Sequence, residues 1–552
     1  MKRKIIGIFI CMLMIATTIP TVESLKNSSI KIMVPNTPLT STTSNWTETQ
    51  KLLALDGATD DEFSSSVSLD GDTAIIGAPF DDDNGIDSGS VYVFTRTGST
   101  WTQQAKLLAS DGAADDRFGW SVSLDDNTVL IGAIWDDDNG GNSGSAYVYT
   151  RTGSTWTQQE KLLASDGSEH DSFANSVSLN SDTALIGTYL DDDNGDASGS
   201  VYVFKRIGTT WTQQAKLLAS DNAQGDLFGK SVSIYGETAL IGAVQDDDNG
   251  AESGSAYVFT CAGTSWTQQA KLLASDGTPG DAFGYSVSLY GETALIGANY
   301  KTSGTGATYV FTRTGNTWTQ QAKLIASDGD SGDNFGKSVS YFADTALIGA
   351  LNHDDGNNSG SAYMFTRTGT TWTEQQKLLA ADGTAGDWFG WSVSLNINTC
   401  LIGAVWDDDN GGNSGSAYVF TKESENQPPN PPTIDGPASG KKGVSYNYNF
   451  VTVDPEGDDV YYWINWSDGS PATEWIGPYP SGQLVIISHT FSQKGTFIII
   501  CQAKDAHNAL SDWGTLSVTM PCSYIIPFQQ FWERLFERFP HAFPLLKHLM
   551  GY

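Results

Sequence analysis

A chain of 552 residues that is 39% hydrophobic and holds 17 Trp is long enough for two or three domains and can bury a substantial core. Its formal charge of −34 argues against nucleic acid and anionic membrane surfaces as partners, because both repel a polyanion. The 58 Gly residues favour many short strands and tight turns over helices.

Residues 1–24 are typical of a signal peptide. Lys2, Arg3 and Lys4 precede an apolar run from Ile5 to Ile19, and a polar stretch suited to cleavage follows. The alternative is a membrane anchor, but the run is shorter than the ~20 apolar residues that a spanning helix needs. We therefore expect a secreted or cell-surface protein with no spanning segment in the mature chain, and a Ser/Thr-rich linker over residues 25–45.

Residues 46–422 contain one block that recurs seven times. The tryptophans that open it are Trp46, Trp101, Trp156, Trp211, Trp266, Trp318 and Trp372. The second copy shows an alternating run from Phe118 to Leu124, an apolar run from Val129 to Ala133, and two further runs, Ala146 to Tyr149 and Trp156 to Leu163. Four strands at a fixed period of this size predict one blade of a β-propeller.

The order of strands in the repeat predicts how the ring closes. The first block begins with the run Trp46 to Ala54, whereas the seventh block ends after Phe420 without such a strand. Pairing the two would remove an open sheet edge. The predicted fold class is therefore all-β: a seven-bladed β-propeller closed by its N-terminal strand, then an immunoglobulin-like β-sandwich and a short helical tail.

Most copies carry Phe-Gly in the first strand and Gly-Ala at the end of the second, as in Phe118-Gly119 with Gly132-Ala133. Two copies depart, with Ser64 and Ala174 in place of the first Gly. In this pattern the chain resembles the FG-GAP repeat, the blade unit of integrin α-subunit propellers and of many microbial surface proteins. The resemblance implies the propeller fold; the function depends on the sites that the fold carries.

The connection after the second strand reads D-D-D-N-G in five copies, and such a loop offers the oxygen ligands that Ca²⁺ prefers. In an extended run the first and third Asp point the same way, so each such pair is predicted to share an ion. The alternative is a solvated turn, since Asp, Asn and Gly are ordinary turn formers. The integrin calcium loop is not carried over, because the connection that would hold it is too short here, as in Asp125 to Asn127. The predicted metal ligands are Asp81, Asp83, Asp136, Asp138, Asp191, Asp193, Asp246, Asp248, Asp407 and Asp409; the sixth copy keeps Asp354 and Asp355.

These loops and the blade-to-blade loops, each with an Asp pair such as Asp111 and Asp116, are expected on one face of the propeller. The T-R-T-G turns, with Arg151 and its equivalents, are expected on the other. Some copies alone carry the tryptophans Trp120, Trp135, Trp391 and Trp406, which are candidates for a carbohydrate-stacking or partner surface, with core packing as the alternative.

An enzymatic role is not expected, and no catalytic residue is predicted. The six His residues show no ligand spacing, and the chain has no nucleophile elbow or phosphate-binding loop. The predicted function is adhesion or binding of an extracellular protein or carbohydrate through the acidic face, with Ca²⁺ as the candidate cofactor. The alternatives are a secreted polysaccharide-acting enzyme, which a unique acid pair near the central axis would favour, and a purely structural envelope component.

The remaining chain divides into a Pro-rich linker, residues 423–432, a sandwich domain, 433–521, and an amphipathic tail, 522–552. The sandwich resembles a PKD domain in its D-P-E-G-D (454–458), W-S-D-G (466–469) and S-H-T-F (488–491) segments, and the resemblance implies a spacer or adhesion module. The tail is a candidate for attachment to the cell surface or for docking on the sandwich. Cys501 and Cys522 are a possible disulfide pair that spacing alone does not establish.

Overall fold

The computed structural model describes residues 45–353, 358–423, 426–521, 534 and 537–538. The predicted signal peptide, the linker before residue 45, Asp354 and Asp355, Cys522 and nearly all of the predicted tail lie outside the described residues. Within the described part of the chain, no helix is long and apolar enough to cross a membrane.

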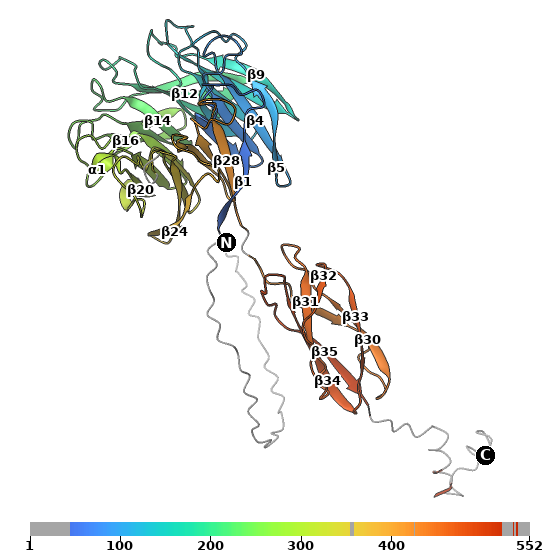
Figure 1. The fold of residues 1–552 in the computed structure, drawn as a ribbon. Helices are drawn as coiled ribbons and strands as arrows, with labels where there is room; N and C mark the ends of the chain where they lie inside the picture. Colours follow the sequence, from blue (N-terminus) through green and yellow to red (C-terminus); the bar gives the residue numbers. More distant parts are fainter. Residues whose placement is uncertain (1–44, 354–357, 424–425, 522–533, 535–536, 539–552) are drawn as a thin grey trace, which may run out of the picture. The chain divides into compact units, whose positions relative to one another are not determined.

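Seven four-stranded antiparallel sheets form the blades of a β-propeller, as predicted (Figure 1). The first three blades are β2 (Ser66–Asp70), β3 (Thr73–Ala78), β4 (Ser90–Thr97) and β5 (Thr100–Leu107); β6 (Phe118–Asp125), β7 (Thr128–Ala133), β8 (Ser145–Thr152) and β9 (Thr155–Leu162); β10 (Ser176–Asn180), β11 (Thr183–Thr188), β12 (Ser200–Ile207) and β13 (Thr210–Leu217). The next three are β14 (Phe228–Tyr235), β15 (Thr238–Ala243), β16 (Ser255–Ala262) and β17 (Ser265–Leu272); β18 (Ser286–Tyr290), β19 (Thr293–Ala298), β20 (Ala307–Thr314) and β21 (Thr317–Leu324); β22 (Ser338–Phe342), β23 (Thr345–Ala350), β24 (Ser361–Thr368) and β25 (Thr371–Leu378). A one-turn helix, α1 (Lys301–Gly304), joins β19 to β20.

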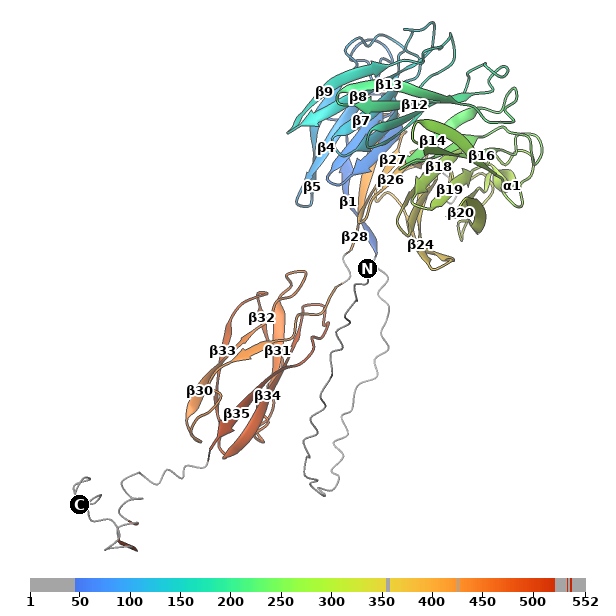
Figure 2. The ribbon, with the colours of Figure 1, turned by 180° about the vertical axis from the view of Figure 1, so that it is seen from behind.

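The seventh blade joins the two ends of the propeller. It consists of β26 (Phe389–Leu395), β27 (Thr399–Ala404), β28 (Ser416–Lys422) and the N-terminal strand β1 (Trp46–Leu52), which pairs antiparallel with β28 (Figure 2). The predicted closure is confirmed: β28 would otherwise present an unpaired edge. In the first blade, Arg96 and Trp101 pair next to the turn between β4 and β5. Lys422 and Trp46 pair in the same way in the seventh blade, so both ends of the propeller lie on the face that carries these turns. We call it the hairpin face.

The hydrophobic core lies between neighbouring blades. Ile75, Val91 and Val93 of the first blade pack against Phe118 and Tyr147 of the second, and all five are fully buried. The Phe118 and Tyr147 rings meet edge to face with centroids 5.3 Å apart, and equivalent pairs occur in the other blades. The second strand of the second blade, β7, is buried along its whole length, as its apolar run predicts.

Close approach between blades explains the glycines of the repeat. A Cβ atom on Gly132 would lie 2.3 Å from the carbonyl oxygen of Ala174 in the next blade, which no side chain tolerates. Gly119 has a φ of +95°, a left-handed conformation that favours Gly. The two departing copies keep this conformation, since Ser64 has a φ of 78° and Ala174 a φ of 67°.

Residues 433–520 form a separate β-sandwich with one sheet of β29 (Thr433–Asp435), β30 (Ser445–Val451) and β33 (Val485–Thr490), and another of β32 (Ile476–Tyr479), β31 (Val460–Asn465), β34 (Gly495–Lys504) and β35 (Gly514–Met520). In its core the Trp466 ring stacks on His489 at 4.2 Å, and His489 Nε2 lies 2.9 Å from Asp468 Oδ2. The W-S-D-G and S-H-T-F segments therefore meet and hold the two sheets together. Within the described residues Cys261, Cys400 and Cys501 are free thiols.

Candidate functional site

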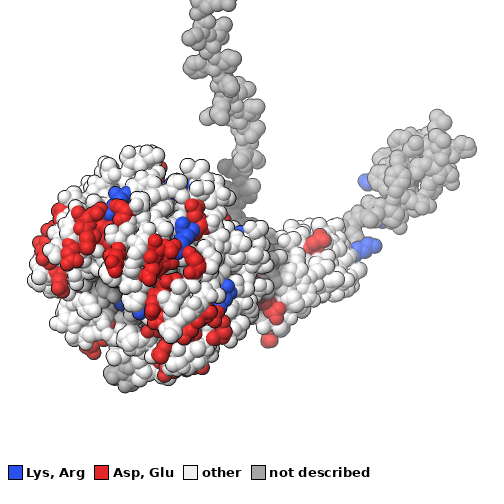
Figure 3. All heavy atoms as spheres, turned by 90° about the horizontal axis from the view of Figure 1, so that it is seen from above, with Lys and Arg blue, Asp and Glu red and all other residues white. Residues whose placement is uncertain are grey.

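The D-D-D-N-G loops and the blade-to-blade loops meet on one face of the propeller, here called the acidic face. The two kinds of loop share hydrogen-bond partners. In the second blade the Tyr147 hydroxyl contacts both the Asp111 and the Asp136 carboxylates. Figure 3 shows Asp and Glu gathered in patches on a face of the propeller, with Lys or Arg side chains among them. The prediction that both kinds of loop share a face is therefore confirmed, and their charges are partly neutralised in place.

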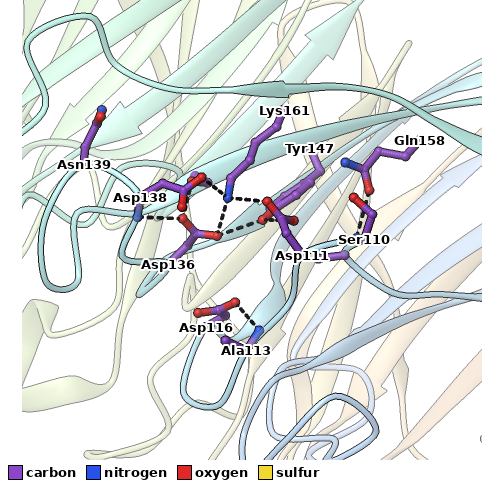
Figure 4. A network of polar contacts seen from close by, with 12 residues as sticks. Ser110, Asp111, Ala113, Asp116, Asp136, Asp138, Asn139, Tyr147, Gln158 and Lys161 are labelled. Carbon is purple, nitrogen blue, oxygen red and sulfur yellow. Dashed lines mark hydrogen bonds and ion pairs between the residues drawn. The ribbon is translucent and has the colours of Figure 1, made fainter.

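In the second blade a lysine ammonium lies between the loops (Figure 4). Lys161 Nζ, from β9, is 2.8 Å from Asp136 Oδ2, 2.6 Å from Asp138 Oδ2 and 2.9 Å from Asp111 Oδ2. Burial alone would lower the pKa of Lys161, but hydrogen bonds to these three carboxylates outweigh it and raise the pKa. The ammonium therefore stays charged and joins the blade-to-blade loop to the outer strand.

The same arrangement occurs in five blades, with Nζ to carboxylate distances of 2.5–3.0 Å. Each network joins one Lys to the first and third Asp of a D-D-D-N-G loop and to one Asp of the preceding blade-to-blade loop. The sets are Lys51 with Asp407, Asp409 and Asp382; Lys106 with Asp81, Asp83 and Asp56; Lys161 with Asp136, Asp138 and Asp111; Lys216 with Asp191, Asp193 and Asp166; and Lys271 with Asp246, Asp248 and Asp221.

The donor set of these loops does not fit Ca²⁺ while the lysine stays in place. Asp136 is buried, and its two oxygens accept hydrogen bonds from the Tyr147 and Ser145 hydroxyls, the Asp138 backbone N–H and Lys161 Nζ. A hard cation needs six to eight free oxygens, and here the ammonium occupies the space between the first and third Asp. Among the described residues, no group of three His, Cys, Asp or Glu side chains is arranged to hold a metal ion.

The calcium prediction is tested by melting the chelator-treated protein with and without millimolar Ca²⁺. Because Lys161 and its equivalents already neutralise the predicted ligands, we expect the melting temperature to stay unchanged and calorimetric titration to show no saturable heat. Mg²⁺ at equal ionic strength is the control for screening. Several binding sites together with a higher melting temperature would show that Ca²⁺ displaces the lysines.

A second aspartate of each blade-to-blade loop lies buried beside the network. Asp116 accepts a hydrogen bond from the Ala113 N–H at 2.6 Å. Burial raises the pKa of Asp116 to about 6, and the charge of Asp136 adds to the rise against the opposing Ala113 hydrogen bond. The pKa values of the equivalent Asp61 and Asp171 are raised to about 6 for the same reason, burial above all.

The fifth and sixth blades carry a basic residue type at the position of Asp136. Lys301 and His353 stand there, both buried. Lys301 Nζ lies 2.7 Å from Asp281 Oδ2, and the His353 ring contacts Asp333, the two aspartates that correspond to Asp116. In these blades the second buried aspartate has a direct partner, whereas the strand lysines Lys323 and Lys377 each keep one acidic partner.

The raised pKa values predict that the propeller is more stable at pH 5 than at pH 7.5. A group whose folded pKa exceeds its unfolded value contributes stability below the unfolded pKa, near 4, and loses it as the pH rises through about 6. We expect Asp116→Asn, whose amide oxygen can still accept the Ala113 hydrogen bond, to raise the melting temperature at pH 7.5 and to change it little at pH 5. An equal effect at both pH values would contradict this account of Asp116.

The copy-specific tryptophans lie around the propeller axis on the acidic face. The first strands of neighbouring blades contact one another and so surround the axis. Trp120, Trp135, Trp391 and Trp406 lie at the start of these strands or just after the second strands, are half-buried, and belong to none of the hydrophobic core clusters. We call the following set of side chains the axial ring: Glu62, Phe80, Arg117, Trp120, Trp135, Tyr189, Lys230, Tyr285, Tyr300, Lys337, Trp388, Trp391 and Trp406.

Contacts between blades hold the axial ring together. Trp388 stacks on Trp406 at 3.3 Å and on Trp391 at 5.3 Å, and Trp406 Nε1 donates a hydrogen bond to Glu62 of the first blade. Arg117 lies over the Trp135 ring at 3.2 Å and over Phe80 at 4.6 Å.

The sequence did not predict Trp388, Arg117, Lys230, Lys337 or Tyr285 as site residues. Their signal is the one that marks the four tryptophans: they stand at repeat positions where the residue type changes from copy to copy, as in Ser65, Asn175 and Lys230. A comparison of the copies position by position would have found them. Such deviation from the repeat indicates a local role, whereas a residue common to all copies is first explained by the architecture.

Comparison with known proteins agrees with the propeller. The model of the FG-GAP repeat matches residues 46–94, 101–149, 156–204, 211–259, 266–311, 318–365 and 372–420. Among solved structures the chain is similar to the PKD domain of an M14-like peptidase from Thermoplasmatales archaeon SCGC AB-540-F20, at 54% identity over 18% of this chain and 100% of that one, with a TM-score of 0.17. No curated protein matches the chain.

Propellers built from this repeat are typically non-enzymatic and of a ligand-binding or adhesion type. The seven matched segments together cover more than half of the chain, and each begins at an opening tryptophan of the predicted repeat. The chain therefore belongs to the FG-GAP repeat family.

Proposed function

We propose that this protein is exported and acts, without catalysis, as an adhesion or ligand-binding protein at the cell exterior, with the axial ring on the acidic face as its contact surface. The ligand class is an extracellular protein or carbohydrate. The signal-like residues 1–24 support export. Calcium is left out of the proposal, because Lys161 and its equivalents occupy the space that the ion would need.

The observation that carries the proposal is the concentration of half-buried aromatic side chains around the axis, outside the hydrophobic cores that hold the blades together. Aromatic residues with one polar group and one accessible surface are enriched where proteins bind ligands. The axial ring also lies on the face opposite to both ends of the propeller, at Trp46 and Lys422.

The test measures binding of the mature chain, residues 25–552, to a panel of immobilised polysaccharides and secreted proteins. We expect Trp406→Ala and Trp135→Ala to weaken the binding of at least one member about ten-fold or more, because such side chains dominate binding energies. Ile207→Ala, which removes an exposed apolar side chain from the hairpin face, is the control. Binding that survives both Trp substitutions would place the contact surface elsewhere, and no binding at all would favour the structural alternative.

A further inference from the structure

Two lysines of the axial ring have no carboxylate partner among the described residues. Lys337 Nζ donates a hydrogen bond to Tyr285 Oη at 2.6 Å and lies 3.9 Å from the centre of the Trp391 ring. Lys230 Nζ lies over the Tyr189 ring at 4.5 Å. The net charge of the chain is −34, and the lysines that bind the D-D-D-N-G loops each contact three carboxylates. Lys230 and Lys337 differ from them in lacking such a partner within the described part of the chain.

Lys230 and Lys337 are linked through Tyr285, which accepts a hydrogen bond from Lys337 and acts electrostatically on Lys230. Burial lowers the pKa of Lys230; the Tyr285 hydroxyl opposes this fall, and the charge of Lys337 adds to it. Burial also lowers the pKa of Lys337, to about 8. Half-buried like charges without a counter-ion are costly, and a bound anion would remove that cost.

The groups around the lysines are flat and amphipathic. Tyr285 lies edge-on to Tyr300, which is 53% exposed, and Trp391 belongs to the stack with Trp388 and Trp406. A small inorganic anion would make no use of these rings. A saccharide ring presents C–H groups that pack on aromatic faces and hydroxyls that bond to the tyrosines, and a carboxylate on it would meet the lysines.

We propose that the axial ring binds a carboxylated saccharide, with its carboxylate between Lys230 and Lys337 and its sugar ring against the neighbouring aromatic side chains. This inference rests on the proposed function and names the ligand class of the same surface. The acidic loops outside the ring repel long polyanions, so the surface favours a short acidic oligosaccharide with a carboxylate that reaches the axis.

Calorimetric titration of the mature chain with tetragalacturonate, maltotetraose and acetate tests the proposal. We expect tetragalacturonate to bind, and Lys230→Met and Lys337→Met each to weaken it about ten- to a hundred-fold, as expected for a lost charge-assisted hydrogen bond. Lys205→Met removes one charge near the hairpin face, where Lys205 bonds to Thr183, and is the control. The affinity of the wild type should fall as the pH rises from 7 to 9 and Lys337 loses its proton.

Several outcomes would overturn this assignment. The proposal of a carboxylated saccharide would be wrong if maltotetraose bound equally well, or if both lysine substitutions left tetragalacturonate binding unchanged. Neither result would contradict the proposed function. Equal binding of acetate would indicate a bare anion site. Loss of binding in Lys337→Met counts only if its melting temperature is not reduced and Lys337→Arg retains binding. If the axial tryptophan variants also keep all binding of the panel, the proposed function itself fails.

Discussion

A chain that lacks residues 1–54 is expected to lose the closed monomeric propeller. Removing β1 leaves β28 with an unpaired edge and removes Trp46 and Leu52, which are 4% and 1% exposed, from the cores of the seventh and first blades. An exposed, apolar strand edge pairs with other chains. Size-exclusion chromatography with light scattering should therefore show dimers or aggregates, and the melting temperature should fall strongly.

The matched control is the chain that lacks residues 1–44, which keeps β1 whole. We expect this chain to remain monomeric with the melting temperature of the full chain, since the described propeller begins at Trp46. A synthetic peptide of residues 45–54 should bind the shorter chain and restore part of its stability. A monomeric, fully stable chain without residues 1–54 would show that β1 is dispensable for closure.

Lys161→Met is expected to destabilise the propeller by about 3 kcal/mol, because removing one partner leaves a buried charge without compensation. Asp136 has a side chain 4% exposed and loses its only cationic partner among the described residues, while Asp138 and Asp111 are left facing it. Adding Asp136→Asn to this variant should recover part of the loss, since the buried charge is then gone. Urea denaturation and thermal melting measure both effects.

Lys323→Met in the fifth blade is the matched control for Lys161→Met. Lys323 occupies the equivalent strand position but pairs with Asp276 alone, and its side chain is 31% exposed. Exposed pairs of this kind contribute about 0–1 kcal/mol, so we expect a small effect. Equal losses in the two variants would mean that the strand lysine stabilises by packing along its stem and not through the buried aspartate.

The sequence was sufficient to predict the architecture, because the length of the repeat and the order of the strands within it can both be read from the recurring residues. The opening tryptophans marked seven blades, and the spare strand at Trp46 indicated the closure that the pairing of β1 with β28 shows. The alternation in Phe118–Leu124 predicted a strand, and it is the inner strand β6, which pairs with β7 and contacts the inner strands of two other blades. The glycines of the motif follow from contacts between blades, which only the folded chain reveals.

The same reasoning did not predict that a lysine neutralises each D-D-D-N-G loop. The D-D-D-N-G segment alone suggests an ion, and nothing near it in the sequence supplies a charge; Lys161 follows Asp138 by 23 residues. The signal was the lysine common to all seven copies, in Lys51, Lys106, Lys161, Lys216, Lys271, Lys323 and Lys377. The exchange of Asp for Lys301 in the fifth copy was a second signal, since an ammonium group cannot replace an oxygen ligand of Ca²⁺.

Closure by β1 also sets an order on folding. The first strand of the propeller to leave the ribosome pairs with the last strand of the propeller to be made, through contacts such as the hydrogen bond that the Thr49 hydroxyl donates to the Val419 carbonyl, 370 residues away. Six blades can form from neighbouring segments as they emerge, but the seventh must wait for the end of the domain. Until then the first strand is an unpaired segment with affinity for a partner not yet synthesised. Any chain that pauses before residue 422 is thus exposed to pairing between nascent molecules at this one seam.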